Sequence, residues 1–126
     1  MTILALHHVQ LAMPPDGESR ATDFYEGILG IPRVAKPAHL EARGGCWFES
    51  SSVRVHLGVE PGFRTAEKAH TAFLVDDLDG LRRSLADAHV PIIDDEPLGG
   101  FDRFYIADPF GNRIEILASD GHSHPE

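Results

Sequence analysis

The sequence is poor in cysteine, in basic residues and in long apolar runs. Cys46 is the single cysteine among 126 residues, so no disulfide can form within the chain, and we expect a reducing, cytoplasmic location. Lysine and arginine number 11 against 20 acidic residues, which gives a formal charge of −9. Because an acidic surface repels phosphate backbones and anionic lipids, we expect neither a nucleic-acid partner nor a membrane partner.

The remaining composition is that of a globular domain. Hydrophobic residues make up 42% of the chain and charged residues 25%, values typical of folded rather than disordered proteins. The opening apolar stretch is interrupted by histidine and glutamine, so it predicts neither a signal peptide nor a transmembrane span. We expect one domain over residues 1–118 and a flexible, polar tail at 119–126.

The apolar pattern divides this domain into two similar halves. Residues 4–13 and 69–75 alternate as strands do, and residues 19–30 and 78–88 place apolar side chains at helical spacing. Shorter strands are predicted after each helix, at 32–35, 45–50, 53–59, 90–94, 102–107 and 112–118. The expected helix caps are Ser19, and Asp76 or Asp77.

Each half therefore has the order βαβββ. The sequence predicts an α+β fold of two such modules, at about 4–60 and 67–118. Whether the modules pair within one chain or across a dimer is left open by the pattern.

Four metal-binding side chains fall at matched positions of this repeat. Alternation along the strands puts His56 and Glu115 opposite the apolar positions, on the face turned away from the helices. His8 precedes His56 by 48 residues, and His70 precedes Glu115 by 45. If the two modules pack about a pseudo-twofold axis, these four side chains converge near it.

Three imidazoles and one carboxylate form a mixed nitrogen and oxygen site that suits one divalent ion of iron, manganese, zinc, nickel or cobalt. The candidate ligands are therefore His8, His56, His70 and Glu115. The alternative is that each is an ordinary hydrogen-bonded or half-exposed strand residue. The side chains expected to contact a small-molecule substrate are Gln10, Arg54, Arg113 and Trp47.

Several segments have the form of motifs of one superfamily. They are LHHVQLAM and DFYEGILGIP in the first half, KAHTAFLVDDLDGL at the start of the second, and RFYIADPFGNRIEIL at its end. Together they resemble the vicinal oxygen chelate superfamily, which includes glyoxalase I, bleomycin resistance proteins and extradiol dioxygenases. The resemblance runs from about Leu4 to Leu117. It implies curved mixed sheets that enclose a cleft, and a metal held on the first and last strands of each module. Here those strands offer His8, His70 and Glu115 as ligands, with His56 as a fourth ligand or a proton-transfer base.

The resemblance also implies a function. We expect a metal-dependent enzyme that acts on a small, oxygen-rich substrate by isomerase, lyase or dioxygenase chemistry, with His56 and Glu115 as catalytic side chains. Glyoxalase I has a glutamate where this chain has His56, so a typical glyoxalase I is not expected. Open sheet edges and the resemblance both favour a homodimer. The competing expectation is a non-catalytic, resistance-type protein that binds or sequesters a small molecule.

Overall fold

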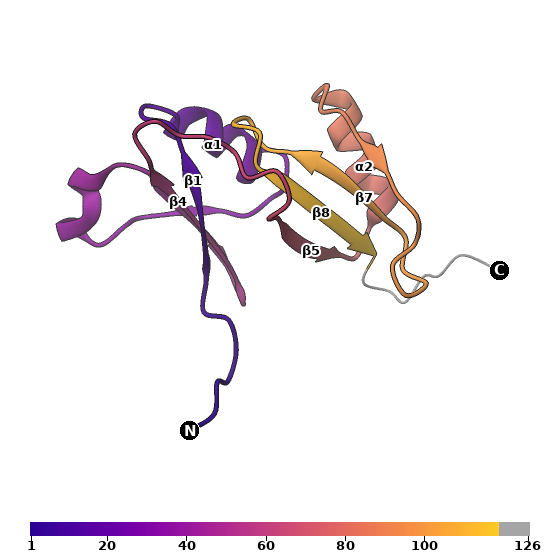
Figure 1. The fold of residues 1–126 in the computed structure, drawn as a ribbon. Helices are drawn as coiled ribbons and strands as arrows, with labels where there is room; N and C mark the ends of the chain where they lie inside the picture. Colours follow the sequence, from indigo (N-terminus) through magenta and orange to yellow (C-terminus); the bar gives the residue numbers. More distant parts are fainter. Residues whose placement is uncertain (119–126) are drawn as a thin grey trace. The chain divides into compact units, whose positions relative to one another are not determined.

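The structure is a computed structural model, and it describes residues 1–118. The predicted tail at 119–126 lies outside the described residues. The chain divides into two compact units, unit 1 (Met1–Thr65) and unit 2 (from Ala66 onward), and each is described here by itself (Figure 1). Over the described residues, no helix is both long enough and apolar enough to cross a membrane.

Unit 1 is a four-stranded mixed sheet with one α-helix on it. Its elements are β1 (Val9–Met13), α1 (Glu18–Tyr25), β2 (Arg33–Val34), the 3₁₀ helix η1 (Ala38–Arg43), β3 (Cys46–Ser50) and β4 (Val53–Val59). The strand order is β1-β4-β3-β2, with β1 and β4 parallel and the other pairs antiparallel. Helix α1 buries Phe24 and Tyr25, and the Tyr25 ring stacks on Phe48 of β3. The core of unit 1 therefore lies between α1 and one face of its sheet.

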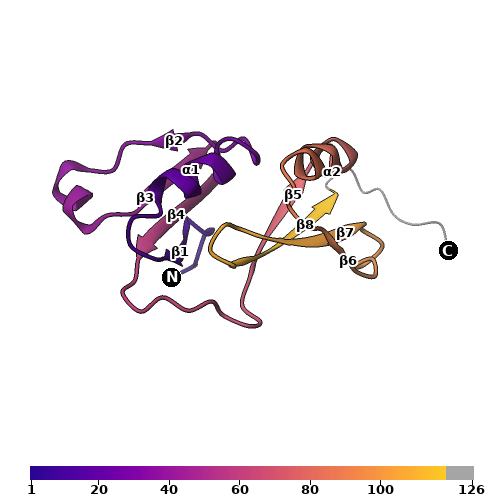
Figure 2. The same ribbon diagram turned by 90° about the horizontal axis from the view of Figure 1, so that it is seen from above.

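Unit 2 repeats this arrangement. Its elements are β5 (Thr71–Val75), α2 (Leu78–Asp87), β6 (Ile93–Asp94), β7 (Arg103–Ala107) and β8 (Arg113–Ala118). The strand order is β5-β8-β7-β6, with β5 and β8 parallel, and α2 lies along the sheet with Leu85 buried (Figure 2). Both units thus have the order βαβββ, and the predicted α+β fold is confirmed. The cleft expected between the modules stays a prediction.

The first strand is shorter than its sequence pattern predicts. Residues 4–13 alternate throughout, but β1 begins only at Val9. Val9 lies opposite Val55, and β4 itself begins at Val53, so the chain before residue 7 has no partner strand to bond with. The apolar side chains of that segment, among them Leu4 and Leu6, are exposed.

The first helix also departs from prediction at both ends. It begins at Glu18 after Gly17, so Ser19 is not its cap, and no side chain caps it. It ends at Tyr25, and turns continue the chain to Gly30, which adopts a positive φ of 75°. Helix α2 follows the prediction more closely, because Asp77 accepts a hydrogen bond from the Gly80 N–H at 2.9 Å.

The cap of α2 gives a stability prediction. The change Asp77→Ala removes the acceptor for the Gly80 N–H and should lower the free energy of unfolding by about 1 kcal/mol. Urea unfolding followed by circular dichroism measures this loss. The matched control is Asp76→Ala, an exposed neighbour outside the cap, which should leave the unfolding midpoint nearly unchanged. Equal losses in the two variants would contradict the assignment of the cap.

Candidate functional site

The registers of the two sheets show which residues of the units are equivalent. In unit 1, His56 of β4 lies opposite Gln10 of β1 and Trp47 of β3. In unit 2, Glu115 of β8 lies opposite Ala72 of β5 and Tyr105 of β7. His56 and Glu115 are therefore equivalent, as the sequence repeat predicts.

The same comparison pairs two further positions. His8 stands two residues before Gln10, and His70 stands two residues before Ala72, so these histidines occupy equivalent places just ahead of β1 and β5. Arg54 stands two residues before His56 in β4, and Arg113 stands two residues before Glu115 in β8. Because side chains alternate along a strand, each arginine shares the sheet face of its neighbour two residues on.

The histidines of unit 1 form a stack of rings. The His56 ring lies 4.0 Å from the Trp47 ring and 4.3 Å from the His8 ring, with interplanar angles of 4° and 21°. Two rings that each stack on a third at this distance occupy its two opposite faces. His56 is therefore enclosed between His8 and Trp47, and only 4% of it is exposed. Unit 1 brings together these three predicted site residues.

Glu49 also belongs to this cluster, although the sequence patterns did not single it out. Its Oε2 atom lies 2.7 Å from His56 Nε2. The available signal was its position two residues after Trp47, which places both side chains on the same face of β3.

The His7 ring lies beside the His8 ring. The Nδ1 atoms of the two rings are 3.0 Å apart, so one ring donates and the other accepts. Strand alternation does not apply there because both residues precede β1. Arg54 donates to the His7 carbonyl at 3.2 Å, and Gln10 packs over Gly58.

In unit 2 the predicted pair is in direct contact. His70 Nε2 lies 2.9 Å from Glu115 Oε1, and Glu115 is 4% exposed. The other ring nitrogen, Nδ1, lies 2.9 Å from the Lys68 carbonyl oxygen. A carbonyl can only accept, so Nδ1 carries the hydrogen. If the ring is neutral, His70 Nε2 carries no hydrogen, and its lone pair faces the negatively charged carboxylate. Such a contact is repulsive unless a proton or a cation lies between the two atoms.

Arg103 is a second residue that the sequence reasoning missed. Its Nη1 atom lies 3.3 Å from Glu115 Oε2 and donates to the Tyr105 hydroxyl at 2.7 Å. Arg113 places its guanidinium 3.9 Å above the centre of the Tyr105 ring. Both oxygens of the Glu115 carboxylate are thus held, one by His70 and one by Arg103.

The pair in unit 2 has the chemistry of metal ligands. Two ligand atoms that bind one metal at a right angle, each about 2.1 Å from it, lie about 3.0 Å from each other. The distance between His70 Nε2 and Glu115 Oε1 is close to this, at 2.9 Å. The donors therefore fit a divalent ion. Within either unit taken by itself, the described residues hold no group of three histidine, cysteine or acidic side chains arranged for a metal. A site that combines His8, His56, His70 and Glu115 accordingly stays a prediction.

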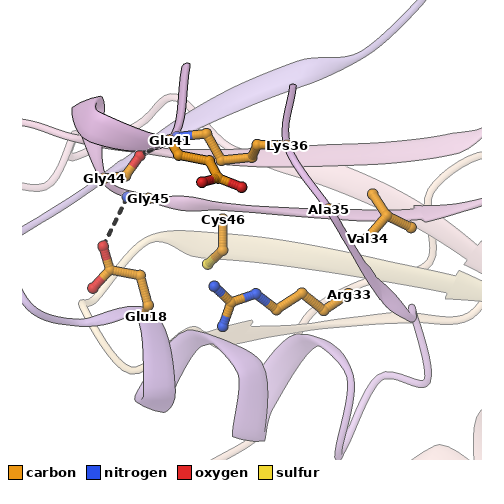
Figure 3. A pocket seen from close by; sticks show the side chains of 9 residues that line it. All are labelled: Glu18, Arg33, Val34, Ala35, Lys36, Glu41, Gly44, Gly45 and Cys46. Atoms are coloured by element: carbon orange, nitrogen blue, oxygen red, sulfur yellow. Dashed lines mark hydrogen bonds between the residues drawn. The ribbon is translucent and has the colours of Figure 1, made fainter. Parts of the chain in front are cut away.

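Unit 1 also has a pocket on the helix side of its sheet, of about 380 Å³ (Figure 3). Glu18 accepts a hydrogen bond from the Gly45 N–H at 2.7 Å, and Lys36 donates to the Gly44 carbonyl. Gly45 has a φ of 81°, and a Cβ there would collide with the Leu57 carbonyl oxygen. The lining residues are Glu18, Arg33, Val34, Ala35, Lys36, Glu41, Gly44, Gly45 and Cys46.

This pocket contains none of the predicted site residues. Cys46 alternates with Trp47 along β3, so its side chain lies on the opposite face of the sheet from His56. Two acidic and two basic side chains line it, so their formal charges cancel.

The fold and these residues can be compared with known proteins. The family model for the Glyoxalase/Bleomycin resistance protein/Dioxygenase superfamily matches residues 5–116. The chain belongs to this superfamily. No curated protein matches the sequence significantly.

Solved structures of the superfamily resemble the chain over nearly its whole length. A presumed glyoxalase family protein from Bacillus anthracis is 40% identical, with a TM-score of 0.89, over 94% of this chain and 97% of that one. A glyoxalase/dioxygenase from Nostoc punctiforme is 22% identical, with a TM-score of 0.73, over 100% and 99%. The fosfomycin resistance protein FosX from Listeria monocytogenes is 16% identical, with a TM-score of 0.74, over 94% and 95%. The last two likenesses show the fold alone.

Cys46 gives a prediction about reactivity. Burial raises the pKa of its thiol above the ordinary value, against the lowering effect of the Arg33 charge. The thiolate is the reactive form, so labelling with a thiol reagent at pH 7.5 should be more than about tenfold slower in the native protein than in urea. The native rate should keep rising as the pH passes the ordinary pKa of a thiol. Equal rates in native and unfolded protein would contradict this account.

Proposed function

We propose that this superfamily member is a divalent-metal-dependent enzyme that acts on a small, oxygen-rich substrate by isomerase, lyase or dioxygenase chemistry. The observation that supports the proposal is a matched placement in the two units: His8 and His70 stand just ahead of β1 and β5, and His56 and Glu115 hold equivalent positions in β4 and β8. Four side chains of metal-binding type at such positions are hard to explain as separate surface residues. One ion of iron, manganese, zinc, nickel or cobalt would be held by His8, His70 and Glu115.

When bound, such an ion polarises a carbonyl or enolate oxygen of the substrate. The chain's own side chains supply the rest. Arg54 and Arg113 lie at equivalent positions and would bind anionic oxygens of the substrate. Trp47 and Tyr105 lie opposite His56 and Glu115 and would give the substrate flat apolar walls. His56 and Glu115 are the groups proposed to hold or move a proton.

The second candidate function is non-catalytic binding of a small molecule. One observation favours it: Glu49 already accepts from His56, and Arg103 already pairs with Glu115, so each group has a charged partner without a metal. In that case the aromatic and arginine side chains alone would form the binding surface. The homodimer and the cytoplasmic location remain predictions under either function.

Metal content separates the two functions. Wild-type protein loaded with each of the five divalent ions and then dialysed should retain one ion per chain, measured by elemental analysis. Glu115→Gln should weaken binding by more than about tenfold, since even residues that only support a ligand contribute about 10–100-fold. Glu67→Gln, an exposed acidic residue of unit 2, is the matched control and should bind as wild type does.

The results have plain meanings. Unchanged metal binding in Glu115→Gln would remove that residue from the ligand set. A wild-type protein that retains none of the five ions would favour the binding protein instead.

Glyoxalase I activity is expected to be negligible. That reaction moves a proton between adjacent carbons of the methylglyoxal–glutathione adduct, and only one of the two equivalent positions here, Glu115, carries a carboxylate. The adduct brings carboxylates of its own, and the chain's charge of −9 opposes its approach. An assay of the thioester product, with zinc, nickel or cobalt loaded, measures this. A kcat/KM above about 10⁴ M⁻¹ s⁻¹, the lower end of ordinary enzymes, would overturn the expectation.

A further inference from the structure

Glu49 stands directly behind one of the proposed site residues. Its carboxylate oxygen lies 2.7 Å from His56 Nε2, with 29% of the Glu49 side chain and 5% of the His56 side chain exposed. An ionised carboxylate can only accept, so this contact places the hydrogen of the imidazole on Nε2. A neutral imidazole with its hydrogen on Nε2 carries its lone pair on Nδ1.

The ring stack fixes the plane of the His56 ring, and the Glu49 contact fixes which edge of the ring faces Glu49. His56 is enclosed between Trp47 and His8, at 4.0 and 4.3 Å, and a ring turned over by 180° would keep this stack but lose the 2.7 Å contact of Nε2 with Glu49. Within residues 1–65, all of which the structure describes, Nδ1 has no hydrogen-bond partner. The stack sets the ring plane, the Glu49 carboxylate sets both the tautomer and the orientation of the nitrogens, and the Nδ1 lone pair is left available.

We propose that Glu49 is a positioning residue that makes His56 act through Nδ1, as a metal ligand or as a proton acceptor. This inference rests on the proposed function. Carboxylates that accept from the far nitrogen of a metal-binding histidine fix its tautomer and orientation in this way. Both ring nitrogens of His70, in contrast, face acceptors: Nδ1 faces the Lys68 carbonyl and Nε2 faces the Glu115 carboxylate. A metal ion at His70 would have to take the place of a hydrogen on Nε2, whereas His56 already presents a lone pair on Nδ1.

The arrangement belongs to unit 1 alone. Glu49 lies opposite Arg54, and the residue opposite Arg113 in unit 2 is Ala107, which cannot accept from a ring nitrogen. In unit 2 the carboxylate stands at the site position itself, as Glu115. In unit 1 the imidazole of His56 occupies the equivalent position, and the Glu49 carboxylate contacts its Nε2 atom. Both units therefore have a carboxylate at this place, but in unit 1 the atom available to a ligand is a nitrogen. The pair His56–Glu49 therefore presents a nitrogen donor at a position equivalent to that of a carboxylate.

The tautomer can be measured in metal-free protein. Long-range proton–nitrogen NMR of ¹⁵N-histidine-labelled protein distinguishes the two neutral tautomers, and the spectrum of His56→Asn assigns the His56 signals. Wild-type protein should show His56 with its hydrogen on Nε2. Glu49→Gln should lose this single tautomer, because the amide both donates and accepts. Glu60→Gln, an exposed acidic residue of unit 1, should leave the spectrum unchanged.

Metal binding is the second measurement. Glu49→Gln should weaken binding of the ion retained by wild type by about 10–100-fold, and Glu49→Asp should recover part of the loss. Glu60→Gln should bind as wild type does. Circular dichroism of each variant shows whether it is folded, and the wild-type tautomer tests the inference even where a variant does not fold.

The outcomes separate the two proposals. A hydrogen on Nδ1 of His56 in wild type, or a Glu49→Gln protein that binds metal within about threefold of wild type, would overturn the role of Glu49. A wild-type protein that binds none of the five ions would overturn the proposed function. The spectra of the metal-free proteins would then decide alone whether Glu49 positions His56.

Discussion

The arrangement of the candidate site depends on one pairing that occurs in each unit: the first strand lies parallel to the last. Because β1 pairs with β4, and β5 with β8, the last strand of each unit is flanked on both sides, by the first strand and by the third. A side chain at the middle of such a strand has neighbours on both sides. His56 and Glu115, each 4% exposed, owe their burial to this position. Polar groups this deeply buried need hydrogen-bond partners, which the neighbouring strands or the segments next to them supply.

The same strand pairing holds different chemical groups in the two units. At equivalent positions, unit 1 has an imidazole held by Glu49 and unit 2 has a carboxylate held by Arg103. In each unit this partner comes from the third strand: Glu49 from β3 and Arg103 from β7. The last strand thus places the site residue, and the third strand supplies a charged side chain in contact with it.

The order of elements could be predicted from apolar spacing alone, and β4 was predicted with the bounds that it has, Val53–Val59. The first strand was overextended because alternation says nothing about whether a partner strand is present. The sheet faces of His56 and Glu115 followed from alternation. Glu49 and Arg103 did not, because a charged residue on a short strand is usually solvated, and only the register of β3 and β7 shows what they contact.

His8 lies outside the strands of its sheet, whereas His56 and Glu115 lie within β4 and β8. It immediately precedes β1, and it is an exposed residue whose ring rests against His56. Glu115, in contrast, lies within a central strand and is already ordered. A donor at the end of an unpaired segment has to give up conformational freedom when it binds. Metal capture through His8 would therefore cost conformational entropy at His8, and its strength would depend on how much of that entropy the ring stack has already removed.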